Sequence, residues 1–206
     1  MLRQRRATQG AGVVRTRAPP RSPKLLVIGY DPVMEGGDAN LMELARRCTL
    51  SPVLIRMWVE AATVMLFKFH RAPPPRTRLS LHWDERRCSL HLDWTQPDRQ
   101  ALESHANEKD ATEAGAYAVA IAAAEHDGYV VRRRAHQGSG ADLLMVRRGE
   151  PDNDFVKLEV SGIARGGGLE NRVTRKAAQV AGGDLARPGV AIVVHFEAAH
   201  IVARGT

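Results

Sequence analysis

Two carboxylates in this sequence stand where strands of a protein core normally carry apolar side chains. Asp142 opens the apolar run Leu143–Val146, and Glu159 lies inside the run Val156–Val160. Burying a carboxylate is costly unless it binds a cation or a hydrogen-bond donor. Mg²⁺ takes one or two protein carboxylates, and such an ion polarises a phosphodiester and activates a water molecule. The pair therefore indicates metal-dependent phosphodiester hydrolysis, with Mg²⁺ or Mn²⁺ as the metal.

The alternation of side chains along a strand decides whether the two carboxylates can meet. It places Glu159 on the same face as Lys157 and Ser161. The polar stretch 148–154 has the length of a hairpin connection, so the strands that carry Asp142 and Glu159 are expected to be neighbours. We therefore expect the two side chains to converge on one cation.

The elements that must position this pair follow from hydrophobic periodicity and from Gly and Pro breakers. The pattern predicts helices over about 111–125 and 169–181, and strands over 129–134, 141–147, 155–160 and 190–196. The resulting order, αβββαβ, favours an α/β (α+β) fold with a mixed sheet.

These features resemble the PD-(D/E)xK, restriction-endonuclease-like nucleases. The resemblance rests on Glu113 in the first helix, Gly128-Tyr-Val130, Gly138-Ser-Gly-Ala-Asp142 and Leu158-Glu-Val-Ser-Gly162, and it covers residues 108–200 or so. It implies that Asp142 and Glu159 hold the metal and that Glu113 is the accessory acid of the first helix. It also implies a nuclease with a restriction-endonuclease-like core, for which DNA is favoured over RNA as the substrate.

The sequence departs from this family at the catalytic lysine. Ser161 stands two residues after Glu159, where the family has a lysine that orients the attacking water. Lys157 or Lys176 would have to replace it, and Lys176 is favoured because Gln179 follows one turn later and could face the same site.

Two alternatives remain open at this point. The chain can be a catalytically inactive fold of this type that binds nucleic acid or a protein partner. Alternatively, Asp142 and Glu159 are structural, as a strand-end turn acid and an ion-pair partner of Lys157.

The region 25–105 is expected to precede this domain as a helical pair and a β-hairpin. A short strand is predicted at 25–28, helices at about 39–48 and 52–69, and two alternating strands within 79–94.

Residues 41–60 also resemble a helix-turn-helix, with Ala45 at the small position of the first helix and Ile55 and Trp58 at core positions of the second. The second helix is long and very apolar, however. We therefore favour a helical pair packed on the following domain or at a dimer interface, and a homodimer or a partner subunit stays open.

The net charge of +7 comes from the first residues of the chain. Residues 1–24 carry seven basic residues and no acid, which leaves 30 − 7 = 23 basic against 23 acidic residues in the remainder. This composition predicts a disordered basic tail at 1–24, before regions 25–105 and 106–206. No apolar run is long enough to span a bilayer and no secretory signal is recognisable, so the expected location is the cytoplasm, without a membrane partner.

Overall fold

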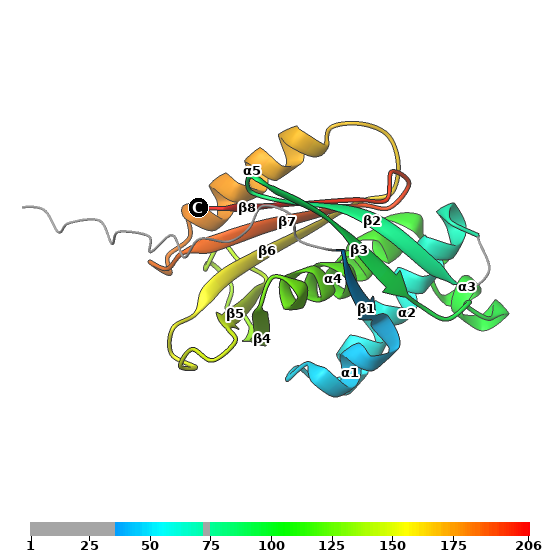
Figure 1. The fold of residues 1–206 in the computed structure, drawn as a ribbon, viewed down its shortest axis with the longest axis horizontal. Coiled ribbons are helices and arrows are strands. Elements are labelled where there is room, and N and C mark those ends of the chain that lie inside the picture. The colour runs from blue at the N-terminus through cyan, green and yellow to red at the C-terminus, as the bar shows by residue number, and fades with distance from the viewer. Residues whose placement is uncertain (1–35, 72–74) are drawn as a thin grey trace, which may run out of the picture. The chain divides into compact units, whose positions relative to one another are not determined.

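The alternating runs of the sequence form one mixed sheet with helices on both faces (Figure 1). The computed structural model describes residues 36–71 and 75–206. The tail expected at 1–24 and the strand expected at 25–28 lie outside the described residues. In chain order the elements are β1 (Gly37–Asn40), the 3-10 turn η1 (Leu41–Glu43), α1 (Leu44–Arg47), α2 (Pro52–Phe69), β2 (Arg76–Trp83), β3 (Arg86–Asp93), α3 (Arg99–Ser104), α4 (Glu108–His126), β4 (Tyr129–Arg134), β5 (Leu143–Arg147), β6 (Val156–Ile163), α5 (Leu169–Ala181), β7 (Gly189–His195) and β8 (His200–Gly205).

The eight strands lie in the order β1-β3-β2-β8-β7-β6-β5-β4. Strands β4, β5 and β6 form an antiparallel meander, and β7 pairs parallel to β6. Strand β8 is antiparallel to β7 and parallel to β2, so it joins the hairpin β2–β3 to the rest of the sheet. The predicted α/β class with a mixed sheet is confirmed, and α4, β4, β5, β6, α5 and β7 follow one another in the predicted order.

Helices α4 and α5 cover opposite faces of the sheet (Figure 1). The main core lies between the sheet and the helices α2 and α4, and it includes Leu158 and Val160 of β6. A smaller cluster under α5 holds Ile163, Val173 and Val193. Strand β6 is thus covered on both faces, which explains why its sequence is apolar almost throughout.

Helix α2 packs along α4 rather than standing apart from it. Nine of its residues are buried, among them Ile55 and Trp58, and Trp58 stacks on Tyr117 of α4. This is the packing that the long apolar second helix predicted, and it does not test the resemblance of residues 41–60 to a helix-turn-helix.

Three local predictions need correction. The first part of the helix expected at 39–48 is wrong, because residues 37–40 form a strand that pairs with β3. The side chain of Asn40 then caps η1 by accepting a hydrogen bond from the Met42 amide at 2.8 Å. The end of the region expected at 25–105 contains a further helix that was not predicted, α3, which Asp98 caps. Strand β8 follows the last strand that was expected.

The sheet runs without interruption across the boundary expected near residue 105, and the described residues 36–71 and 75–206 belong to one compact unit. None of the helices in the described ranges is long and apolar enough to cross a bilayer.

Candidate functional site

One edge of strand β6 is left open halfway along its length. Strand β5 pairs with β6 only from Leu143 opposite Leu158 to Met145 opposite Val156. Beyond Leu158, β6 continues to Ile163 with β7 alone as its neighbour. An unpaired strand edge exposes backbone donors and acceptors, and the candidate site lies at this opening.

Asp142 stands at the start of that opening, next to Glu159. Its amide donates to the carbonyl of Leu158 at 3.0 Å, and its Oδ2 accepts from the amide of Val160 at 2.9 Å. The carboxylate therefore satisfies the first free donor of the open edge. Neighbouring strands bring Asp142 and Glu159 together, as the sequence predicted.

Glu159 is nearly inaccessible, with 2% of its surface exposed. Its Oε1 accepts hydrogen bonds from Lys176 Nζ at 2.5 Å and from Gln179 Nε2 at 2.8 Å, both on α5. Burial is the main reason that the pKa of Glu159 lies above its ordinary value. The hydrogen bond from Lys176 opposes this rise, and the charge of Asp142 adds to it.

A cavity of about 310 Å³ opens beside the pair, between α4, β6 and α5. Helix α4 contributes Glu113 and Tyr117 to its wall, spaced one turn apart on the same face of the helix. Burial first, and then the carboxylate of Asp142 as a charge and hydrogen-bond partner, raise the pKa of Tyr117. The phenol therefore stays protonated and can act as a donor towards Asp142.

Gly162 allows α4 to come this close to β6. A Cβ atom at Gly162 would lie 2.4 Å from the carbonyl oxygen of Thr112, which is too close for any side chain. The contact fixes the residue immediately before Glu113 against the strand that carries Glu159. The motif Leu158-Glu-Val-Ser-Gly162 includes this glycine, but the sequence did not predict that it positions Glu113.

The basic side chains of the cavity all come from α5. Arg172, Arg175 and Lys176 line it together with Asp142, Val160 and Ser161. Arg172 donates to the hydroxyl of Ser161 at 3.2 Å, so a guanidinium lies at the strand position where the family motif has its lysine.

The two candidate lysines lie in different surroundings. Lys176 lines the cavity and contacts both Glu159 and Gln179, whose Oε1 is 3.1 Å from Nζ. Lys157 is 1% exposed and is not among the lining residues. Glu113, Asp142 and Lys176 therefore line the cavity. Glu159 and Gln179 do not line it but are joined to Lys176 by hydrogen bonds, whereas Lys157 neither lines the cavity nor contacts Lys176 through a hydrogen bond among the described residues.

Sequence reasoning missed Tyr117, Arg172 and Arg175. A signal for them exists, because residues 172, 175, 176 and 179 follow the i, i+3, i+4, i+7 pattern of one helix face, and Tyr117 is four residues after Glu113. Many helices with one buried face carry such a polar stripe on the other face. It indicates a functional site here only because Lys176 contacts Glu159.

The donor set fits a hard divalent cation that keeps most of its water. Hydrogen bonds within 3.5 Å engage Asp142 Oδ2 and Glu159 Oε1, and the phenol of Tyr117 is a further hydrogen-bond partner of the Asp142 carboxylate. Across the described ranges, no three His, Cys, Asp or Glu side chains gather into a metal-binding group. Two carboxylates suit Mg²⁺, whose remaining positions water or phosphate oxygens fill, and they would not suit a structural zinc ion.

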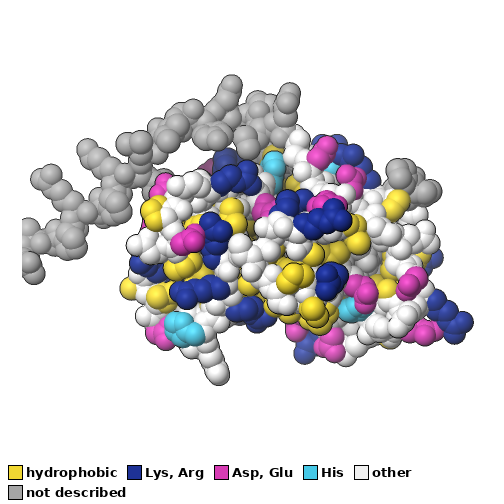
Figure 2. Space-filling model, turned by 90° about the horizontal axis from the view of Figure 1, so that it is seen from below, with side chains coloured by type: hydrophobic (Ala, Val, Ile, Leu, Met, Phe, Trp, Pro, Cys, Tyr) yellow, Lys and Arg dark blue, Asp and Glu magenta, His cyan; other side chains and the backbone are white. Residues whose placement is uncertain are grey.

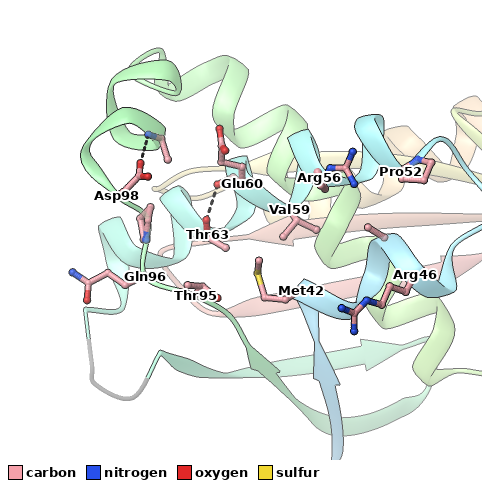
Figure 3. A pocket seen from close by; sticks show the side chains of 13 residues that line it. Met42, Arg46, Pro52, Arg56, Val59, Glu60, Thr63, Thr95, Gln96 and Asp98 are labelled. Carbon is pink, nitrogen blue, oxygen red and sulfur yellow. Dashed lines mark hydrogen bonds between the residues drawn. The ribbon is translucent and has the colours of Figure 1, made fainter.

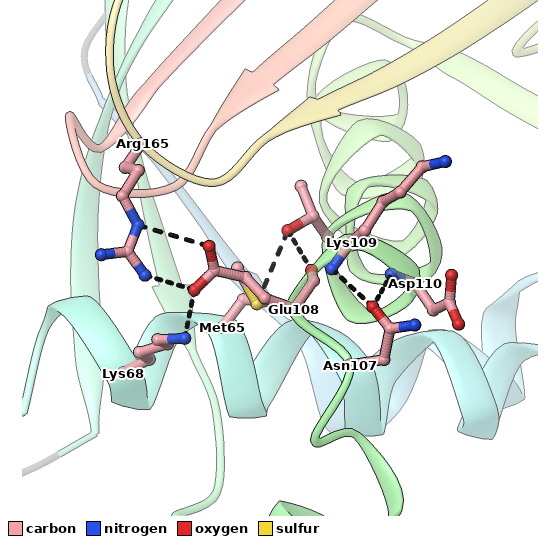
Figure 4. A network of polar contacts seen from close by, with 8 residues as sticks. Met65, Lys68, Asn107, Glu108, Lys109, Asp110 and Arg165 are labelled. Atoms are coloured by element: carbon pink, nitrogen blue, oxygen red, sulfur yellow. Dashed lines mark hydrogen bonds and ion pairs between the residues drawn. The ribbon is translucent and has the colours of Figure 1, made fainter.

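A second cavity of about 410 Å³ adjoins the first and shares Glu113 and Arg172 with it. Its wall includes Arg165. Arg165 and Lys68 of α2 both form ion pairs with Glu108 (Figure 4). The pKa of Glu108 is lowered, first by the hydrogen bond from Arg165 and second by the hydrogen bond from Lys68. This network ties the end of α2, the start of α4 and the loop after β6 together beside the cavity.

No protein-family model matches the sequence, and neither a curated protein nor a solved structure matches it. The assignment of a function therefore depends on the residues of the site.

Proposed function

We propose that this chain is a metal-dependent nuclease with a restriction-endonuclease-like core, in which Asp142 and Glu159 hold Mg²⁺ or Mn²⁺. The observation that carries the proposal is the meeting of these two carboxylates at the open edge of β6, beside a cavity lined by three cations of α5. Carboxylates for a metal and cations for a phosphate are the two requirements of phosphodiester hydrolysis.

Each residue of the site then has a role that its position supports. A bound Mg²⁺ would polarise the phosphodiester and lower the pKa of a coordinated water. Lys176, 2.5 Å from Glu159 Oε1, is placed to hold the attacking water against that carboxylate, and Gln179 fixes the same oxygen from one turn further along α5. Arg175, which also lines the cavity, would hold a phosphate of the substrate.

The substrate we propose is nucleic acid, and DNA rather than RNA. Residues 25–206 balance their charges, so attraction to phosphates has to come from the local cations of the cavity and from the basic residues 1–24.

A second candidate is a non-catalytic binding protein with the same fold. The engagement of Glu159 by Lys176 and Gln179 favours it, since a buried carboxylate satisfied in this way can be purely structural. Ser161 at the position of the motif lysine also favours it.

A nicking assay on supercoiled plasmid tests the proposal. Wild type, Asp142→Asn, Glu159→Gln and Lys176→Met are compared with Mg²⁺, with Mn²⁺ and with a chelator, and Glu150→Gln in the exposed β5–β6 loop serves as the matched control. We expect nicking that needs the metal and is lost in both carboxylate variants. Loss of a proton-transferring or water-orienting group lowers rates by roughly 10²–10⁴-fold, which is the reduction expected for Lys176→Met.

The control should cleave as wild type does. Wild type that binds the plasmid but leaves it intact with either metal would favour the second candidate. Cleavage that persists in Glu159→Gln would contradict the nuclease site itself.

A further inference from the structure

A groove of about 640 Å³ lies between η1–α1, the first half of α2 and the start of α3. None of its lining residues belongs to the site proposed above. Its floor is apolar, with Val59 buried and Met42 47% exposed at the rim. Figure 2 shows hydrophobic side chains interspersed with charged ones on the lower face of the molecule in Figure 1, where α1 is drawn.

Charges of opposite sign occupy opposite ends of this groove. Glu60 and Asp98 lie towards one end, and Arg46 and Arg56 lie towards the other, with Val59 and Met42 between them (Figure 3). The side chains of Arg46 and Glu60 are 79% and 51% exposed, so their existing partners, Glu43 and His105, leave them accessible.

A ridge runs beside the groove on the same helix. Val53 is 69% exposed and Met57 is 47% exposed. Each precedes a charged residue of the groove wall by three positions, Arg56 and Glu60, so ridge and wall are adjacent on the surface of α2. Exposed apolar side chains next to an apolar groove are typical of an interaction surface.

We propose that this surface binds a second copy of the chain through a two-fold interface. In such an interface each residue pair occurs twice, so the surface must be complementary to itself. The groove meets this condition in charge, because a two-fold axis near Val59 brings its acidic end onto the basic end of the other copy. In the proposed dimer the exposed Val53–Met57 ridge of each copy would enter the apolar groove of the other. An acidic or a basic peptide would be complementary in charge to only one end of the groove.

The antiparallel meeting of two α2 helices places Arg56 opposite Glu60 of the second copy. Reversing one of these charges sets like charges against each other twice in one interface, whereas exchanging both restores the attraction. If either residue were merely structural, exchanging both charges would not restore the association.

Analytical ultracentrifugation of the full chain over a range of concentrations measures the association. We expect a wild-type dimer that weakens as salt screens the charges. Arg56→Glu and Glu60→Arg should each be monomeric, their double variant dimeric, and an equimolar mixture of the two single variants should form a mixed dimer. Arg148→Glu and Glu150→Arg, exposed and outside the groove, are the matched controls and should dimerise as wild type does.

A wild type that is monomeric at every concentration would overturn the proposal, as would single variants that remain dimeric. The outcome is independent of the nuclease assay, because none of the substituted residues lines the active-site cavity.

Discussion

Glu159 accepts hydrogen bonds from two residues of α5 and is almost inaccessible to water. Its raised pKa, caused mainly by burial, means that the folded protein holds a proton at pH values where the unfolded chain has already lost it. The contribution of Glu159 to stability therefore falls as the pH rises from about 4.3, the ordinary glutamate value, through the folded-state pKa.

Glu159→Gln removes this titration, so its stability relative to wild type should increase with pH across that window and level off above it. Each pH unit between the two pKa values corresponds to about 1.4 kcal/mol. Urea unfolding of both proteins in a chelating buffer between pH 4.5 and 8 measures the difference. A difference that is constant, or that shrinks as the pH rises, would disprove the account of Glu159.

At this scale the sequence predicts the acids better than their surroundings. Asp142 and Glu159 can be found because the first directly precedes an apolar strand and the second interrupts one, and a buried acid is costly unless it has a partner. Arg172 and Arg175 lie on a polar helix face of an ordinary kind, and Tyr117 stacks on Trp58 as a core aromatic residue would. Only the packing of α4 and α5 against β6 therefore assigns them to the site.

The contact between α2 and α4 depends on Gly115. A Cβ atom there would lie 2.9 Å from the backbone nitrogen and Cα of Ala62, and backbone cannot retreat as a side-chain end can. Alanine improves helix propensity over glycine by about 1 kcal/mol, whereas overpacking costs about 1–3 kcal/mol. We expect Gly115→Ala to destabilise the protein by as much as about 2 kcal/mol, because separating two packed helices outweighs the propensity gain.

Gly167→Ala provides the comparison, since a Cβ atom at Gly167 has open space and the backbone there is compatible with alanine. Reducing the freedom of the unfolded chain should leave this variant as stable as wild type or stabilise it by about 0.4–1 kcal/mol. Thermal unfolding of both decides the matter, and equal stability of Gly115→Ala and wild type would show that α2 and α4 are packed less closely than described.

Elements with strong local periodicity were predictable, and those formed by tertiary pairing were not. The hairpin β2–β3 follows directly from alternation, with Leu79 and Leu81 buried on one face. Strand β1 consists of Gly, Asp, Ala and Asn, which are poor strand formers, and it exists because β3 offers it an edge. Strand β8 was missed because its apolar core is only Ile201 to Ala203.

At the scale of the whole molecule, β8 explains why two regions that differ in sequence character form one unit. It pairs with β2 on one side and with β7 on the other, and so continues the sheet from the N-terminal hairpin to the strands that carry the site. Pairing between strands so far apart in sequence leaves no local pattern, so the sequence indicated two regions where one sheet forms.

The central claim is that Asp142 and Glu159 together hold a divalent metal, and a calorimetric titration with Mn²⁺ tests it without requiring cleavage. We predict one site in wild type and in Glu150→Gln, and no detectable binding in Asp142→Asn or Glu159→Gln. Removing either ligand leaves too few carboxylate oxygens to displace water from the ion. Wild type that binds no Mn²⁺, or carboxylate variants that bind it as wild type does, would contradict the claim.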